Sequence, residues 1–333
     1  MRRRSIIQML TIGVLAGLAT AAVAYFIPWL PDAAAEEAGP IDNAYWLATI
    51  ISIVIFGIVA GVSVYAVFKF RARPDDEEDG SPIHGHTGLE VFWTAIPTAL
   101  VTAISVYSGV VLTQNEQPDF DRRVVEVTAE QFAWSFHYPD EEITSGELVL
   151  PVGQQVELKM TAKDVIHAFW VPEWRLKQDT VPGIFTRLLI TPTKLGTFPV
   201  VCTELCGLGH AVMRSRARVL EQAGFDRWVT EQQEARAGGG GAGQAKELFA
   251  SAGCGSCHAL ADAAATGAVG PSLDEALQGK DAAFVKTAIL DPDAEIAPGY
   301  QPGLMPKTYG DTLSEAQIDG LVEYLLQATG AGG

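Results

Sequence analysis

Residues 202–213 read CTELCGLGHAVM, and this stretch concentrates side chains that bind soft metal ions. Cys202, Cys206 and His210 are spaced by four residues, and Met213 follows three residues later. The preceding FPVV is typical of a strand, and the two glycines inside the stretch favour a loop. Because a loop at the end of a strand can fold these four side chains around one point, the pattern predicts a metal site.

A fifth donor must come from another segment, and His167 in DVIHAFWVP lies in a second strand-like stretch. Thiolates, imidazoles and a thioether form a soft set that favours copper over calcium, magnesium or manganese. A single blue-copper site uses one cysteine, whereas two thiolates can bridge two copper ions, with His167 on one and His210 on the other. Met213 and the backbone carbonyl of Glu204 would then be weak outer ligands. Zinc on two cysteines and two histidines stays open at this point, although it leaves Met213 without a role.

Residues 254–258 read CGSCH, a C-x-x-C-H pattern. Cys254 and Cys257 can bond to the two vinyl groups of a haem, and the adjacent His258 can reach the iron. A redox dithiol or half a zinc site would not explain the adjoining histidine. Met305 is the only methionine after residue 243, so it is the candidate second axial ligand. Histidine and methionine together suit electron transfer rather than oxygen chemistry.

Three long apolar runs near the N-terminus predict membrane spans. Residues 1–37 open with three arginines and predict either a signal peptide or an extra transmembrane segment. Cleavage near the small residues 33–35 is the favoured interpretation. Residues 38–117 hold two further runs and predict a transmembrane helical hairpin. The positive-inside rule places the arginines and the basic cluster at 69–73 in the cytoplasm, so the chain after Leu112 lies outside.

The pattern of apolar residues divides the remaining chain into a strand-rich part and a helical part. Residues 118–236 contain short alternating apolar runs separated by turn residues, which predicts a β-sandwich. Residues 237–243, AGGGGAG, predict a flexible glycine linker. Residues 244–333 predict a small helical domain, whose closing helix places Ile318 and Leu321 at helical spacing.

The charge balance excludes a nucleic-acid partner. The chain carries 40 acidic and 23 basic residues, for a net charge of −17. Binding to phosphates needs lysine and arginine, so an acidic chain of this kind is unsuited to it. The excess suits a cationic partner or simply keeps exposed domains soluble.

The pattern Cys-x-Glu-x-Cys-x-x-x-His-x-x-Met, with an upstream Val-Ile-His, resembles the binuclear copper-A site of cytochrome c oxidase subunit II. The segment 244–329 resembles a small class I cytochrome c, as in bacterial oxidases whose electron donor is fused to subunit II. The resemblance implies a multidomain fold with a transmembrane α-helical hairpin, a cupredoxin-like β-sandwich and a small all-α cytochrome c domain. It also implies two cofactors, binuclear copper A and one covalently bound haem c.

Further residues take an expected role only from this resemblance. Glu90 in LEVFWTAIP matches an acidic residue near the entry of a proton pathway, and Asp179 matches one near the interface with subunit I. The side chain of Glu204 matches one that helps bind magnesium at that interface. Where the family has an electron-accepting tryptophan, this chain has Phe132, with Trp134 two residues further on. That departure puts the usual docking entry in doubt and suits delivery by a tethered haem; ordinary core packing is the alternative for both rings.

The resemblance implies an electron-entry subunit of a proton-translocating, oxygen-reducing oxidase, with no oxygen-reduction site in this chain. The expected partners are oxidase subunits I and III, a small electron-donor protein such as a cytochrome, and membrane lipid. The expected location is the bacterial cell membrane, with several spans and with the copper and haem domains on the extracytoplasmic side. A copper-A nitric oxide reductase is one alternative. A membrane-tethered copper carrier or assembly factor is another, from a different functional class.

Overall fold

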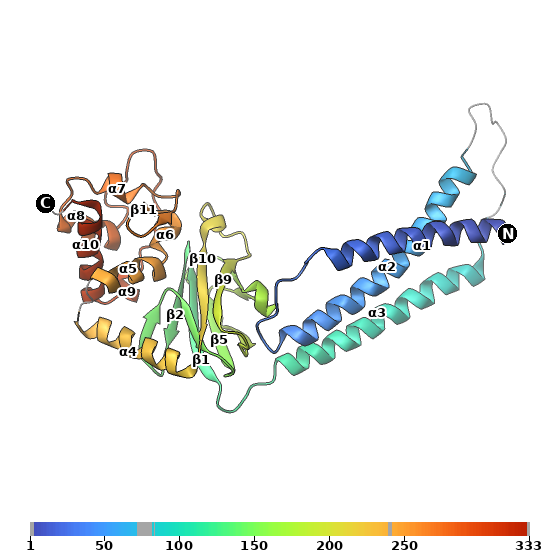
Figure 1. Ribbon diagram of the computed structural model, residues 1–333, viewed down its shortest axis with the longest axis horizontal. Helices are drawn as coiled ribbons and strands as arrows, with labels where there is room; N and C mark the ends of the chain where they lie inside the picture. The colour runs from blue at the N-terminus through green and yellow to red at the C-terminus, as the bar shows by residue number, and fades with distance from the viewer. Residues whose placement is uncertain (1–2, 72–81, 83, 239–241, 332–333) are drawn as a thin grey trace. The chain divides into compact units, whose positions relative to one another are not determined.

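The computed structural model describes residues 3–71, 82, 84–238 and 242–331. The chain divides into two compact units, one of residues 1–31 with 39–115 and one of residues 32–38 with 116–333. The first unit is helical, and the second contains a β-sandwich and a small helical domain (Figure 1). This order confirms the predicted fold class.

Three helices in the first unit are long and apolar enough to cross a membrane. They are α1 (Arg3–Phe26), α2 (Ala38–Lys69) and α3 (Thr87–Asn115). At a rise of about 1.5 Å per residue, even the 24-residue α1 exceeds a hydrocarbon core of about 30 Å. The two runs predicted as a hairpin form α2 and α3.

Threonines inside α3 satisfy their hydroxyl groups within the helix. The Oγ1 atoms of Thr94, Thr98 and Thr102 donate to the carbonyl four residues earlier, at 2.9, 2.7 and 2.8 Å. Because a bilayer core offers no water to polar groups, this pairing lets the hydroxyls remain in an apolar span.

The sandwich in the second unit has two five-stranded sheets, of order β3-β2-β1-β5-β8 and β4-β10-β9-β6-β7. The first sheet contains β1 (Arg123–Glu130), β2 (Ala133–Tyr138), β3 (Ile143–Ser145), β5 (Val156–Ala162) and β8 (Thr186–Ile190). The second contains β4 (Leu148–Pro151), β6 (His167–Trp170), β7 (Lys177–Thr180), β9 (Gly196–Cys202) and β10 (Arg214–Leu220). Alternate residues of β1 and β5 are buried, as period-two patterning requires. The sheets close on a core that includes Phe136, Tyr138, Phe169 and Trp174.

The register of β6 against β9 brings two distant parts of the chain together. The strands are antiparallel neighbours, and Phe169 pairs with Cys202. Since β9 ends at Cys202 and β10 begins at Arg214, the intervening residues form one connecting loop. The backbone N–H of Cys202 donates to the carbonyl of Met213 at 3.2 Å and closes the base of that loop.

The short segment 32–38 between α1 and α2 belongs to the sandwich unit. Ala34 and Ala35 are buried, and Ala35 forms an isolated antiparallel bridge with Pro192. The buried carboxylate of Glu37 accepts hydrogen bonds from the backbone N–H and the hydroxyl of Thr191, at 3.1 and 2.9 Å. The sequence did not predict this attachment.

The C-terminal region forms a second hydrophobic core after helix α4 (Gln222–Gly238). Its elements are α5 (Ala242–Ser251), α6 (Cys254–Cys257), β11 (Ala259–Leu260), β12 (Ala265–Thr266), α7 (Leu273–Ala276), α8 (Ala282–Leu290), α9 (Tyr309–Thr312) and α10 (Glu315–Thr329). The rings of Phe249 in α5 and Tyr324 in α10 meet edge to face at 6.3 Å. The two-stranded ribbon β11-β12 is a small addition to the all-helical domain that we predicted.

The structure describes only part of the predicted glycine linker. Residues 237 and 238 end α4, and residues 242 and 243 begin α5. The remaining positions, 239–241, lie outside the described residues.

Candidate metal and haem sites

Five sulfur and nitrogen donors meet at the loop between β9 and β10. The Sγ atoms of Cys202 and Cys206 are 3.9 Å apart. His167 Nδ1 lies 3.1 Å from Met213 Sδ and 3.9 Å from Cys202 Sγ. His210 Nδ1 lies 3.6 Å from Cys206 Sγ, and Met213 Sδ lies 3.8 Å from the same sulfur. The structure therefore brings together all five side chains that the sequence selected.

A sixth predicted donor, the backbone carbonyl of Glu204, also lies at the cluster. Its oxygen is 3.3 Å from Cys202 Sγ. The Glu204 side chain is exposed, so only the carbonyl of this residue faces the sulfur cluster.

The imidazole of His210 lies outside the tightest group of donor atoms. His167, Cys202 and Cys206 form a group in which every donor atom lies within 4.8 Å of every other. His210 is outside that group, although its Nδ1 is close to Cys206. A single tetrahedral zinc would draw both imidazoles to one centre. The arrangement instead suits two centres that share the thiol pair.

The electrostatics of the thiol pair also fit a bound cation. Burial alone would raise the pKa of Cys202, but hydrogen bonds with His167 and the backbone N–H of Ala168 outweigh it and lower the pKa to about 6. Burial, together with the charge on Cys202, raises the pKa of Cys206 to about 12. Two adjacent thiolates repel each other, so both ionise readily only with a positive charge beside them.

Asp164 orients the His167 ring, and sequence reasoning missed it. His167 Nε2 lies 2.9 Å from Asp164 Oδ1, which leaves Nδ1 facing the sulfurs. Asp164 also accepts hydrogen bonds from the backbone N–H groups of Gln131 and Val165, both at 2.7 Å. Carboxylates commonly hold a ligating histidine in this way. The signal was an acidic residue three positions before the histidine.

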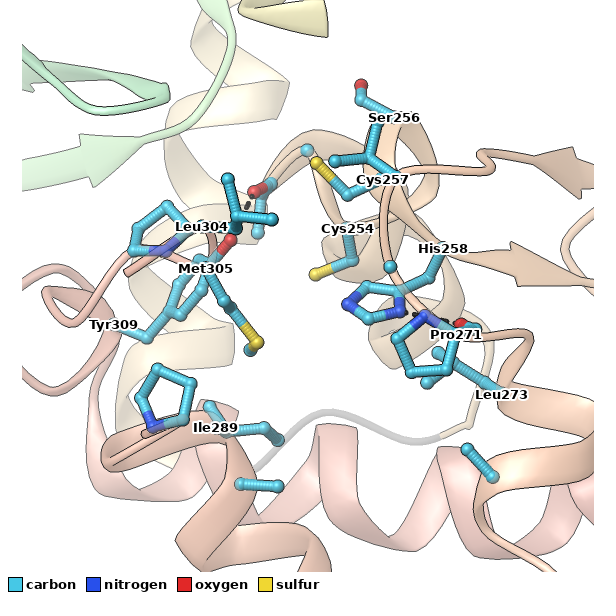
Figure 2. Close-up of a pocket in the computed structure, with 18 of the residues that line it drawn as sticks. Cys254, Ser256, Cys257, His258, Pro271, Leu273, Ile289, Leu304, Met305 and Tyr309 are labelled. Carbon is cyan, nitrogen blue, oxygen red and sulfur yellow. Dashed lines mark hydrogen bonds between the residues drawn. The ribbon is translucent and has the colours of Figure 1, made fainter. Parts of the chain in front are cut away.

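A cavity of about 340 Å³, lined mostly by the C-terminal domain, lies beside the C-x-x-C-H residues. Figure 2 shows His258 and Met305 facing each other across the open space, with Cys254 and Cys257 along one edge. This places the four predicted haem-binding residues around one cavity of a size typical for a cofactor.

The His258 ring presents one nitrogen to this cavity. Its Nδ1 is hydrogen-bonded to the carbonyl of Pro271 at 2.9 Å, so Nε2 is left for a ligand (Figure 2). Burial lowers the pKa of His258, which keeps the imidazole neutral and able to bind a metal. Gly270 permits this approach, because a Cβ there would lie 2.5 Å from the His258 ring.

The two thiols at the cavity are held neutral. Burial, aided by the proximity of Cys257, raises the pKa of Cys254 to about 12. Burial also raises the pKa of Cys257. A thiol whose pKa is raised by burial is a poor redox nucleophile at neutral pH. Both thiols fit covalent attachment to a haem.

Family models match along most of the chain. Cytochrome C oxidase subunit II, transmembrane domain, matches residues 19–111, and the periplasmic domain of the same family matches residues 142–219. Cytochrome c matches residues 242–329. A cytochrome c oxidase subunit 2 from Thermostichus vulcanus is 34% identical over 280 residues, which cover 68% of this chain and 85% of that protein. The chain belongs to the cytochrome c oxidase subunit II family.

Two further relatives carry the same family name. Cytochrome c oxidase subunit 2 of Bacillus subtilis is 32% identical over 315 residues, covering 84% of this chain and 85% of that protein. The protein of that name from Alkalihalophilus pseudofirmus is 35% identical over 248 residues, covering 68% and 70%. Membership of the family implies copper A for the sandwich, and the cytochrome c match implies haem c for the helical domain.

Phe132, which we expected at the position of the family's tryptophan, packs on the metal-binding loop. The loop makes room for the ring with two glycines, because a Cβ on Gly209 would lie 2.4 Å from Phe132 Cδ2 and one on Gly207 would lie 3.1 Å from Cζ. The adjacent Gln131 donates from Nε2 to the carbonyl of Cys206 at 2.5 Å. Both residues therefore support the loop.

Trp134 lies in β2, between the metal donors and the haem cavity. Its ring meets Phe169 and His167 edge to face, with centroids 5.6 and 6.3 Å apart. Trp134, Phe132 and Val212 are among the residues that line the cavity holding the C-x-x-C-H segment. The buried indole N–H of Trp134 has no hydrogen-bond partner among the described residues. The core-packing alternative and the electron-path interpretation both fit the burial of this ring.

The remaining family-derived residues lie outside the cluster. The carboxylate of Glu90, in the first turn of α3, accepts a hydrogen bond from the backbone N–H of His86 at 2.9 Å. Asp179 is an exposed residue of β7. Among the described residues, no second acidic side chain joins Glu204 in a potential metal-binding group. Magnesium at Glu204 therefore needs ligands from elsewhere.

Proposed function

We propose that this chain is the electron-entry subunit of a bacterial oxygen-reducing cytochrome c oxidase. It carries electrons through a covalently attached haem c and a binuclear copper-A centre to subunit I, where oxygen is reduced. The observation that carries the proposal is the presence, in one unit, of a five-donor soft-metal cluster and a cavity with a C-x-x-C-H segment facing a methionine.

The geometry supports a specific division of the metal donors. Cys202 and Cys206 would supply the thiolates shared by the two copper ions. His167 and Met213, which lie 3.1 Å apart, serve one ion. His210 and the carbonyl of Glu204 serve the other. When bound, the copper pair and the haem supply one-electron carriers, and the haem is held by Cys254, Cys257, His258 and Met305.

The protein residues between the two sites supply the route. Phe132 packs against Gly207 and Gly209 of the copper loop. Trp134 contacts the His167 ring and also lines the haem cavity. A conjugated ring in contact with a metal ligand shortens the through-space gap that an electron must cross. The route serves a donor that is tethered to the copper domain, and tethering raises its effective concentration.

An exposed apolar surface beside the copper loop suits the interface with subunit I. Leu205 and Leu208 on the loop are 80% and 81% exposed. Large exposed apolar side chains grouped around a functional site are typical of a docking surface. Magnesium held by Glu204 and by a partner subunit would lie at the same interface, near Asp179.

We also propose a membrane location and further partners for this chain. The three helices long and apolar enough to cross a membrane support a multi-pass protein of the bacterial cell membrane. Its copper and haem domains would lie on the extracytoplasmic side. Subunit III, a small cytochrome-like electron donor and membrane lipid are its further partners. Glu90 lies near the cytoplasmic proton entry of subunit I.

The test compares Cys206→Ser with Ala211→Ser in the purified oxidase. Both substitutions place a hydroxyl group in the same loop, but only the first removes a bridging thiolate. We expect Cys206→Ser to retain the haem, to accept electrons from a reduced carrier and to lose onward transfer, while Ala211→Ser behaves as the parent. A haem in Cys206→Ser that reoxidises at the parental rate would refute the proposed order. Activity with nitric oxide instead of oxygen would indicate the reductase alternative, and release of copper to an acceptor protein would indicate a carrier.

A further inference from the structure

Helices α1 and α2 meet through glycines on both surfaces. Gly13 and Gly17 on α1, and Gly57 and Gly61 on α2, each form a Gly-x-x-x-Gly pair. A Cβ on Gly13 would lie 2.7 Å from the Gly57 carbonyl oxygen, and one on Gly57 would lie 2.9 Å from the Gly13 carbonyl oxygen. A Cβ on Gly61 would lie 2.6 Å from the carbonyl oxygen of Met9. The two backbones are therefore in direct contact.

The contact is tightest at Gly13, and the neighbouring Gly17 contributes less, since its Cα lies 3.7 Å from where a Cβ on Gly57 would be. A Cβ on Gly17 would meet nothing within 4 Å, although Gly17 is one turn from Gly13. In a bilayer the lipid tails are as apolar as the side chains, so helices associate through close packing rather than hydrophobic burial. Small residues that let two backbones touch provide that packing.

The segment that follows α1 is also attached. The backbone N–H of Ala34 donates to the Glu173 carbonyl at 2.9 Å, and the N–H of Thr193 donates to the Ala34 carbonyl at 2.9 Å. These residues include the small side chains that predict a cleavage point. In the fold they form a buried strand-like bridge rather than an exposed, extended substrate for a peptidase.

We propose that α1 remains in the mature protein as a third membrane span, held against α2 by the contact of Gly13 with Gly57 and Gly61. This replaces the favoured sequence interpretation of a cleaved signal peptide. It has a consequence for assembly, because α1 covers the glycine face of α2. A partner subunit must then dock on α3, on the outer face of α1 or on the other faces of α2.

The first measurement is the intact mass of this chain in the purified oxidase. We expect a mass that includes residues 3–35. A mature chain that begins after residue 26 would overturn the proposal, whether or not the chain is still functional as an oxidase subunit.

The second measurement tests the glycine contact in the full-length chain. Spin labels on Leu10→Cys and Phe56→Cys, two exposed positions on α1 and α2, report the separation of the helices. We expect Gly13→Leu to lengthen and broaden the distance distribution and the matched Gly17→Leu to leave it unchanged. Failure of Gly13→Leu alone to accumulate would also support the contact. Equal behaviour of the two variants would overturn it.

Discussion

Gly209→Ala is the sharpest perturbation of the copper loop, because one methyl group must share space with an aromatic ring. The added Cβ would lie 2.4, 2.5 and 2.9 Å from Cδ2, Cγ and Cε2 of Phe132. Real Cβ contacts are almost never shorter than 3.0 Å, so the ring or the loop must move. The backbone of Gly209 has φ −88°, which alanine adopts freely, so the cost comes only from the ring.

The magnitude follows from the cost of overpacking a buried site, about 1–3 kcal/mol. We therefore expect a loss of about 2 kcal/mol in the free energy of unfolding, near the middle of that range. Because the moved loop carries Cys206 and His210, we also expect faster loss of copper to a chelator.

The assay is a urea titration of the detergent-solubilised chain, followed by circular dichroism and by the copper absorption. The matched control is Gly224→Ala in α4, where the new Cβ would be 3.4 Å from Leu220, an ordinary contact. That change should stabilise the helix by about 0.5–1 kcal/mol. Glycine to alanine is thus expected to lower the free energy of unfolding at position 209 and to raise it at position 224.

A double-mutant cycle decides whether Phe132 is the cause. In the Phe132→Leu background, Gly209→Ala should cost at least about 1 kcal/mol less than in the parent, because the clashing ring is gone. An unchanged cost in that background would refute the reasoning, as would a Gly209→Ala chain as stable as the parent.

Three further outcomes are expected. Met305→Ala should keep covalent haem but lower its reduction potential in a redox titration, since the thioether ligand raises it; an unchanged potential would remove Met305 from the iron. Asp164→Asn should weaken copper retention about 10–100-fold in a chelator competition, because His167 Nε2 loses its charged partner; parental retention would show that this partner is dispensable. Tyr138→Phe should cost about 1–3 kcal/mol of unfolding free energy, because the buried Val149 N–H donates to the Tyr138 hydroxyl at 2.6 Å and would lose its acceptor; a stability change within 0.3 kcal/mol would contradict that bonding role.

The features that sequence alone predicted are those with local causes. The spacing of Cys254, Cys257 and His258 is set within five residues and needs no knowledge of the fold. The lengths of the apolar runs determine which segments can cross a bilayer, because a helix rises by a constant amount per residue. Alternation within β1 and β5 records which face of each strand is buried.

Other features depend on pairings between distant segments. Asp164 acts through the ring of His167, and only the folded chain shows that this ring turns Nδ1 to the sulfurs. The role of Gly209 becomes visible only with Phe132 lying against it. The favoured cleavage near residues 33–35 was inferred from small side chains, which are equally suited to the buried bridge that the structure shows.

The sequence by itself determined the donor types of the copper loop, the haem-binding motif, the membrane helices and the strand-rich texture of the central domain. Each of these follows from side-chain chemistry or from a periodicity read over a few residues. Tertiary structure decided how donors 35 residues apart meet, because strand register sets His167 beside Cys202. It also placed Met213 on the His167 side of the thiol pair and Gly13 against Gly57. Such contacts depend on how strands pair and helices cross, and no local pattern encodes that geometry.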